Sequence, residues 1–166
     1  MDPAQDLWVI DTSSVIAVRE LRKDVQREAY RKLSDLAERG TLLFPLQVLD
    51  ELKRIADPSR PDPPLKWATE NKAKATCTPI PFEIVREVLA EVDDLLDYEK
   101  PTPDEEADPY VLALAVELQQ KGHRVTVITE DRRDRPGKTS LATACGVFHV
   151  PSLPVRMFLK RQGVGE

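Results

Sequence analysis

Two carboxylates follow apolar runs of the length expected for buried strands. Asp11 comes directly after Leu7–Ile10, and Asp131 comes shortly after the β-branched run Arg124–Ile128. If both runs are parallel strands of one sheet, their carboxyl ends meet at the same edge. An ionised carboxylate removed from water is unfavourable by several kcal/mol unless donors, cations or a metal compensate it. The residues that converge at this edge are then Asp11, Thr129, Glu130, Asp131 and Asp134.

Glu51 is the third candidate acid. The segment from Pro45 to about Ala56 is predicted to be a helix, and Glu51 lies at the border of its apolar side. Its neighbour Asp50 points away, together with Lys53 and Arg54. An ion pair between Glu51 and Arg54 on the helix surface is the competing interpretation, and its small stabilisation would not hold the glutamate outside if a metal were present.

Asp108 is the fourth candidate, because it precedes Pro109 and an almost wholly apolar helix that must be buried. Asp followed by Pro is also an ordinary helix start, and Asp11 is likewise suited to cap a helical turn. We expect the cluster to contain no equally placed lysine or arginine, so its members would repel one another. A hard divalent cation, Mg²⁺ or Mn²⁺, resolves that repulsion.

Strands and helices are predicted to alternate along the chain. Beyond the two runs already named, strands are expected at 42–44 and 147–150. A loop of four prolines is expected at 57–64 and a polar connection at 98–108. Helices are expected at 24–39, 45–56, 65–75, 82–96, 109–120, 141–145 and 153–161. This alternation predicts an α/β fold, a three-layer α/β/α sandwich with a central, mainly parallel sheet.

Composition restricts the class of protein. With 166 residues and 41% apolar content, the chain is expected to form a single domain at 1–166. A net charge of −5 argues against a general nucleic-acid coat but leaves room for a nuclease with a local basic rim. No run is long enough to span a membrane. Cys77 and Cys145 are expected to be buried free thiols, so a cytoplasmic protein is predicted.

Four segments together resemble the acidic motifs of PIN-domain ribonucleases, which are metal-dependent enzymes that include bacterial and archaeal toxins. The segments are VIDTSSVI, PLQVLDEL, ADPYVLALA and VITEDRRD. The resemblance covers residues from about 7 to 150, and the four segments are similar to the family's motifs in their order and spacing. It implies an RNA substrate, one or two Mg²⁺ or Mn²⁺ ions, an antitoxin partner and pairing into a homodimer, for which the helix at 82–96 offers an apolar face.

The resemblance also implies roles for particular residues. Asp11 and Asp131 would bind the principal metal, Asp108 would take a shared or second position, and Glu51 would bind metal or hold the attacking water. Thr12 or Ser13 would orient Asp11 or a water, and Asp134 would be a fifth acid. The nearby basic residues would contact RNA phosphates or, in the competing interpretation, form a solvated loop: Arg132, Arg133, Arg135 and Lys138.

Two further classes of function compete with the nuclease. A PIN-like module could keep the fold and bind RNA or protein without cutting, although a silent domain has little reason to retain four repelling acids. A phosphate-accepting receiver domain needs an acidic pair near the first strand and a lysine soon after a late strand, and neither is present. The GKT tripeptide at 137–139 lacks the glycine that a nucleotide-binding loop requires five positions earlier, so no nucleotide cofactor is expected.

Overall fold

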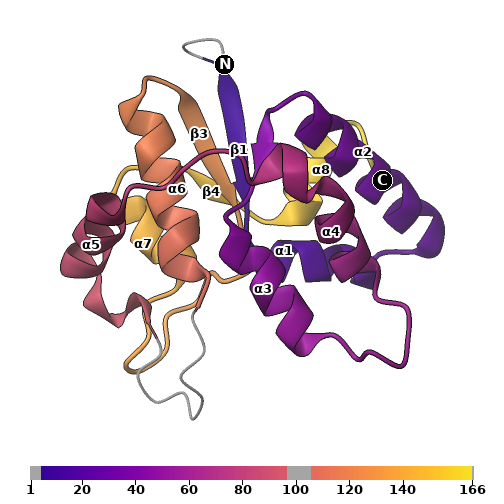
Figure 1. Ribbon diagram of the computed structural model, residues 1–166, viewed down its shortest axis with the longest axis horizontal. Helices are drawn as coiled ribbons and strands as arrows, with labels where there is room; N and C mark the ends of the chain where they lie inside the picture. Colours follow the sequence, from indigo (N-terminus) through magenta and orange to yellow (C-terminus); the bar gives the residue numbers. More distant parts are fainter. Residues whose placement is uncertain (1–4, 97–105, 166) are drawn as a thin grey trace.

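In the computed structural model, which describes residues 5–96 and 106–165, one parallel sheet lies at the centre of the fold. The described strands run in the order β2-β1-β3-β4 and all pair in parallel. Helices cover both faces (Figure 1), which confirms the predicted three-layer α/β/α sandwich. The strands are β1 (Asp6–Ile10), β2 (Leu42–Leu43), β3 (Arg124–Ile128) and β4 (Ser152–Leu153).

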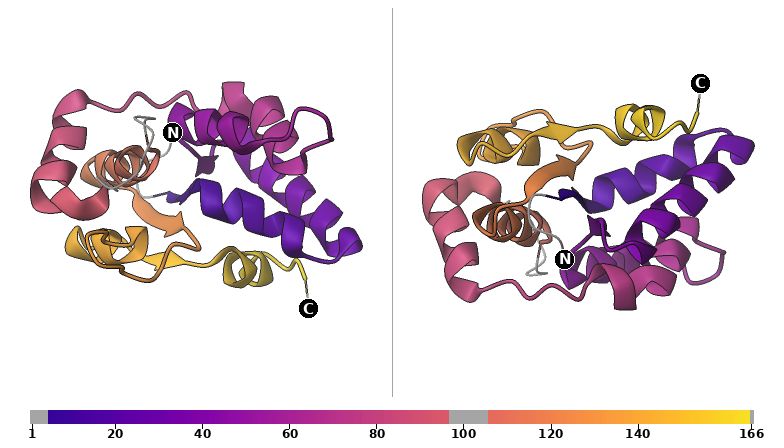
Figure 2. Two further views of the ribbon diagram at one scale, coloured as in Figure 1. Left: turned by 90° about the horizontal axis from the view of Figure 1, so that it is seen from below. Right: turned by 90° about the horizontal axis from the view of Figure 1, so that it is seen from above.

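The helices divide between the two faces of the sheet. Figures 1 and 2 show α5, α6 and α7 on one side of the strands and α1 to α4 with α8 on the other. Their bounds are α1 (Thr12–Ala17), α2 (Lys23–Glu38), α3 (Leu46–Ile55), α4 (Pro63–Ala75), α5 (Phe82–Glu91), α6 (Asp108–Gln120), α7 (Leu141–Val147) and α8 (Val155–Arg161). Two short 3₁₀ turns, η1 (Val18–Glu20) and η2 (Asp93–Leu95), complete the described elements.

The central strands β1 and β3 set the position of the carboxyl edge of the sheet, where the acids are predicted to meet. β1 and β3 pair along their whole length, from Asp6 opposite Arg124 to Ile10 opposite Ile128. The Asp11 amide continues this ladder by donating to the Ile128 carbonyl at 2.9 Å. Because α6 runs back along the sheet into β3, its first turn lies at the carboxyl end of the strands (Figure 1). The predicted convergence of β1, β3 and the start of α6 is therefore confirmed.

The prediction for the fourth strand is wrong. Helix α7 continues through Val147, and the predicted strand at 147–150 is instead a helix end followed by a turn. His149 has the left-handed φ of 58°, and the Val150 amide closes the turn on the Cys145 carbonyl at 2.9 Å. The strand begins only after this reversal, at Ser152, which also delays α8 to Val155 instead of residue 153.

Two helix boundaries also differ from those expected. The helix predicted at 82–96 ends at Glu91, because Val92 leaves helical geometry with φ −131° and ψ 77°. The loop predicted at 57–64 gives way to α4 at Pro63, since proline fits the first helical turn and the Asp62 carboxylate caps the Leu65 amide at 3.0 Å. Most of the polar connection predicted at 98–108 lies outside the described residues.

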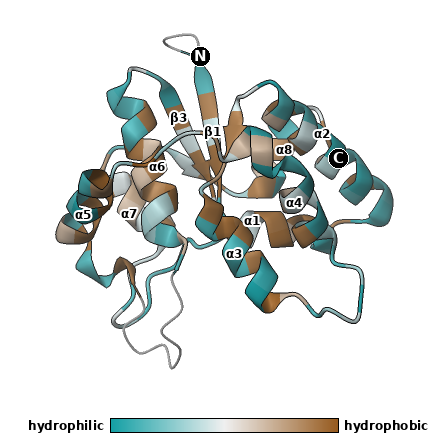
Figure 3. Ribbon diagram, viewed as in Figure 1, coloured by the Kyte–Doolittle hydropathy of each residue, from teal (hydrophilic) through white to brown (hydrophobic). Residues whose placement is uncertain are grey.

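Apolar residues gather on the strands and on the inward sides of the helices, as Figure 3 shows. Trp67 is buried and packs against Phe44 and Tyr30, so it belongs to the core. Cys145 is buried as expected, but the expectation of a buried thiol is wrong for Cys77, which is exposed. Within the described residues, none of the helices has the length and apolar character needed to cross a membrane.

The core predicts a large difference between two aliphatic truncations. Leu112 on α6 has no exposed surface, whereas Met157 on α8 is 47% exposed. Leu112→Ala should therefore lower the free energy of unfolding by about 2–5 kcal/mol, and Met157→Ala by less than about 1 kcal/mol. Urea denaturation followed by circular dichroism measures both. Equal effects of the two substitutions would contradict the burial of α6.

Candidate metal centre

The four predicted acids line one cleft at the carboxyl edge of the sheet. The cleft has a volume of about 480 Å³. Each acid comes from a different segment: the end of β1, helix α3, the first turn of α6 and the loop after β3. The complete lining is Asp11, Thr12, Ser13, Ile16, Glu51, Arg54, Ile55, Asp108 and Asp131.

Asp11 is both a helix cap and a member of the cleft. Only 3% of its surface is exposed. Its Oδ1 accepts from the Thr12 amide at 2.8 Å, and its Oδ2 accepts from the hydroxyls of Ser13 at 2.7 Å and Thr129 at 2.9 Å. Burial raises the pKa of Asp11 to about 6, although these hydrogen bonds oppose the rise and the charge of Glu51 adds to it.

Glu51 connects the start of α1 to the residue before α6 across the cleft. Its Oε1 accepts from the Thr12 hydroxyl at 2.5 Å, and its Oε2 accepts from the Ala107 amide at 3.0 Å. The predicted inward orientation of this glutamate is therefore confirmed. Thr12 and Ser13 were expected to orient Asp11 or a water, and the structure shows both donating to Asp11, with Thr12 also reaching Glu51.

Asp108 is paired with Lys138, a residue expected from the sequence to contact RNA phosphates. The Lys138 Nζ lies 3.1 Å from Asp108 Oδ2 and 3.9 Å from Asp131 Oδ2. Because Lys138 is only 7% exposed, the expected contact between this lysine and RNA phosphates is wrong. The expectation that no cation shares the cluster is wrong as well. Burial and the charge of Asp11 still raise the pKa of Asp108 well above its ordinary value, while Lys138 lowers it.

The loop after β3 separates three acids into different roles. Asp131 lines the cleft, and its Oδ2 accepts from the Leu141 amide at 3.1 Å. Asp134 does not line it: this exposed residue accepts from the Ser140 amide at 2.9 Å, which holds the pKa of Asp134 below its usual range. Glu130 accepts from the Ser14 hydroxyl at 2.6 Å and the Val155 amide at 2.9 Å, so it fixes the start of α8.

The three arginines predicted beside the cleft, Arg132, Arg133 and Arg135, are exposed, as a phosphate contact or a solvated loop would require, and their contact with RNA stays a prediction. Arg132 donates to the Ser152 hydroxyl at 3.2 Å. Arg54 lines the cleft from α3, although its helical position had been placed on the outward side with Asp50. The helical position of Arg54 alone does not predict this contact, because a long side chain at the border of a helix face can reach across the neighbouring surface.

The donor set fits a hard divalent cation. Four carboxylates supply only oxygen ligands, and burial together with mutual repulsion leaves Asp11 and Asp108 with raised pKa values. Asp108 Oδ1 and Asp131 Oδ1 accept no hydrogen bond from the described part of the chain. Within that part, no three acidic, histidine or cysteine side chains stand close enough together to form a ready-made metal site. The acids would therefore have to close around an ion.

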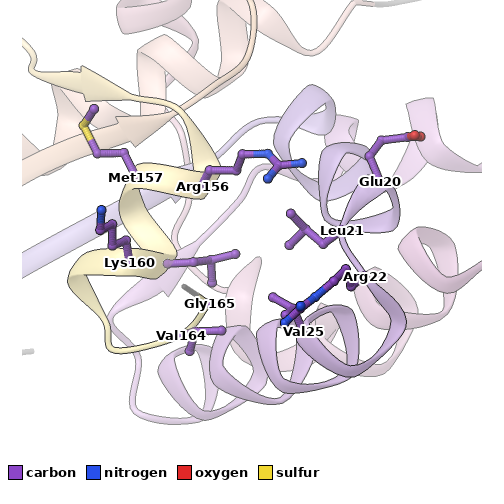
Figure 4. Close-up of a pocket in the computed structure, with 10 residues that line it drawn as sticks. Glu20, Leu21, Arg22, Val25, Arg156, Met157, Lys160, Val164 and Gly165 are labelled. Carbon is purple, nitrogen blue, oxygen red and sulfur yellow. The ribbon is translucent and has the colours of Figure 1, made fainter.

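A different cavity lies between α8 and the segment that joins η1 to α2 (Figure 4). It has a volume of about 540 Å³, and Figure 4 shows Leu21, Val25 and Val164 beside Arg22, Arg156 and Lys160. Glu20 is the one acid in its lining. This groove lacks the carboxylates that a hard cation needs, so the acidic cleft is the candidate metal centre.

The raised pKa of Asp11 predicts a pH dependence of stability without metal. The carboxyl has a pKa of about 6 in the folded chain against 3.8 as its ordinary value. Since the folded state binds this proton more tightly, the free energy of unfolding falls as pH rises from about 4 to about 6. Denaturation in EDTA between these pH values should show a shallower fall for Asp11→Asn. An identical pH dependence of the two proteins would contradict the shift.

No curated protein matches the chain. The family model that matches is described as a domain of unknown function, DUF4411, and the match extends over residues 8–165. This range contains all four acids of the cleft, Lys138 and every strand except the first two residues of β1. Because the match spans nearly the whole chain, the protein belongs to the DUF4411 family.

Proposed function

We propose that this protein is a metal-dependent endoribonuclease that hydrolyses RNA phosphodiester bonds with Mg²⁺ or Mn²⁺. One observation carries the proposal: Asp11, Glu51, Asp108 and Asp131 come from four separate segments and line one cleft. Nothing in the packing of an α/β core requires four carboxylates at one place, and their repulsion opposes folding. A bound divalent cation would turn this repulsion into ligand binding.

Asp11, Asp108 and Asp131 are the residues that would hold the ion. When bound, such an ion activates a water for attack and neutralises charge on the phosphate. The chain itself supplies orientation. Thr12 and Ser13 fix both oxygens of Asp11, and the contacts of Glu51 with Thr12 and the Ala107 amide hold its carboxylate at the cleft, where it would accept a proton from the attacking water.

The surroundings of the cleft support a polyanionic substrate. Arg54 stands in the cleft wall, and Arg132 and Arg133 are exposed on the loop that carries Asp131. Arginine side chains bind phosphate oxygens well because the planar guanidinium presents several donors. The resemblance to PIN-domain ribonucleases adds support for RNA as the polymer.

A second candidate is a PIN-like module that binds RNA or protein without cutting. Two observations favour it: the described residues hold no preformed cluster of three metal ligands, and Lys138 already neutralises part of the charge at Asp108. One ammonium, however, balances only one of four carboxylates. Burial and the charge of Glu51 raise the pKa of Asp11 to about 6, and the hydrogen bonds that Asp11 accepts oppose this only in part, so we favour the nuclease.

The proposed activity predicts metal-dependent cleavage of RNA by the purified protein. Asp11→Asn should lower the cleavage rate by more than about 100-fold, because it removes a charged ligand and leaves a side chain of the same shape. A gel assay with labelled single-stranded and structured RNA, in Mn²⁺, Mg²⁺ or EDTA, measures the rates. Circular dichroism shows whether the variant remains folded.

A matched pair of substitutions on α3 provides the control. Glu51→Gln changes an acid in the cleft, whereas Asp50→Asn changes its neighbour, which does not line the cleft. We expect a large loss of cleavage for Glu51→Gln and less than about a two-fold change for Asp50→Asn. If no RNA is cut with either metal, or Asp11→Asn cuts as fast as the natural chain, the binding module is the better assignment.

We also propose that this nuclease acts in the cytoplasm as a toxin whose activity an antitoxin protein blocks. A homodimer is part of the same proposal, and Phe82, 66% exposed at the start of α5, is a suitable contact. Induced expression should arrest growth, Asp11→Asn should not, and the product of a neighbouring gene should restore growth. Colony counts after induction measure this. Normal growth at high expression contradicts the toxin role alone.

A further inference from the structure

Lys138 is a buried cation inside the acidic cluster. Its side chain is 9% exposed, and its Nζ contacts Asp108 Oδ2 at 3.1 Å, the Thr139 carbonyl at 3.0 Å and Asp131 Oδ2 at 3.9 Å. These contacts come from the loop after β3 and the start of α6. Since a buried ammonium is strongly unfavourable without partners, the two carboxylates and the lysine stabilise one another.

The backbone around Lys138 holds the ammonium in this position. Lys138 and Arg135 exchange backbone hydrogen bonds at 2.9 and 3.0 Å across a turn in which Gly137 has the left-handed φ of 74°. On the other side, the Thr139 amide and hydroxyl both donate to Asp94, at 2.8 and 2.6 Å. A lysine fixed on both sides by its neighbours has little freedom to leave the cluster.

The contacts of Lys138 fall on particular oxygens. It engages Oδ2 of Asp108 and approaches Oδ2 of Asp131, which also accepts from the Leu141 amide. An ion shared by these two oxygens would have to displace the ammonium. Asp108 Oδ1 and Asp131 Oδ1 accept no hydrogen bond from the described chain, so they would be the oxygens open to one ion once these two aspartates and Asp11 close around it.

The charges at the cleft agree with this division. The four carboxylates carry four negative charges when ionised, and Lys138 offsets one of them. One divalent ion leaves a single negative charge among these groups, which the charge of Arg54 in the cleft wall can balance, whereas two divalent ions would leave a positive excess beside the buried ammonium. Like charges confined to a low-dielectric site repel strongly.

We propose that Lys138 is the resident second cation of this centre and limits it to one divalent ion. This inference rests on the proposed function, because it concerns the ion that the nuclease would use. Lys138 acts as a positioning residue: it is buried, does not line the cleft, donates to Asp108 Oδ2 at 3.1 Å and places its charge 3.9 Å from Asp131 Oδ2.

Titration of the full-length protein with Mn²⁺ in a calorimeter, without RNA, tests the inference by stoichiometry. The natural chain should bind one ion per chain, and Lys138→Ala, which removes the charge and leaves space, should bind two. Lys138→Arg keeps the charge and should bind one. Lys160→Ala, at an exposed lysine on α8, is the matched control and should also bind one.

Removal of the ammonium leaves buried carboxylates without their partner, so Lys138→Ala should unfold at a lower temperature in EDTA and regain stability in Mn²⁺. If that variant does not fold, Lys138→Gln is the neutral replacement of similar length. Two ions bound to the natural chain would overturn the role of Lys138 and leave the nuclease proposal standing. One ion bound to both the natural chain and the neutral variant would also overturn it. Failure of the natural chain to bind Mn²⁺ would overturn the proposed function itself.

Discussion

Repulsion between carboxylates at one edge of a parallel sheet is the constraint on which this structure depends. Every acid of the cleft meets a donor from another segment. Asp11 accepts from Thr129, Glu51 from Thr12 and the Ala107 amide, Asp108 from Lys138 and Asp131 from the Leu141 amide. Donors that favour the ionised form lower a carboxyl pKa, while burial and neighbouring acids raise it. For Asp11 and Asp108 the second effect is larger, so the protein donors compensate the charge only in part.

The same contacts join the layers of the fold. Glu51 lies on α3 and holds the amide that precedes α6, so a single side chain connects helices on opposite faces of the sheet. Glu130, which does not line the cleft, joins the loop after β3 to two helices of one face, α1 and α8, through the Ser14 hydroxyl and the Val155 amide. The segments that supply the acids of the site are thus also segments that pack the layers of the sandwich.

The sequence was sufficient for the features that depend on local pattern. β3 was predicted with its observed bounds, and the four acids could be placed because each one follows or borders an apolar run whose burial is certain. The strand at 147–150 was predicted wrongly because a β-branched valine next to aromatic residues favours a strand locally, whereas in the structure α7 continues through Val147 and a turn with a left-handed φ at His149 follows it.

Lys138 and Asp134 show a second limit of the sequence. Both lie in a loop rich in charged residues, where composition alone predicts exposed side chains. A Pro-Gly pair at 136–137 is a recognisable turn signal, and it predicts that the chain reverses before Lys138. It does not predict that the reversal carries the lysine inward and leaves Asp134 outside. That outcome depends on Asp94, which holds Thr139 from a distant segment.

The choice between a nuclease and a silent binding module depends on the charge that remains after Lys138 is counted. A silent module could tolerate the cluster by keeping protons on Asp11 and Asp108, and their raised pKa values allow this below about pH 6 for Asp11. At neutral pH most Asp11 carboxyls would be ionised while buried, next to Glu51 and with only neutral donors of their own. An amide or hydroxyl at this position would avoid burying that charge, whereas a bound divalent ion, as proposed for the nuclease, would compensate it.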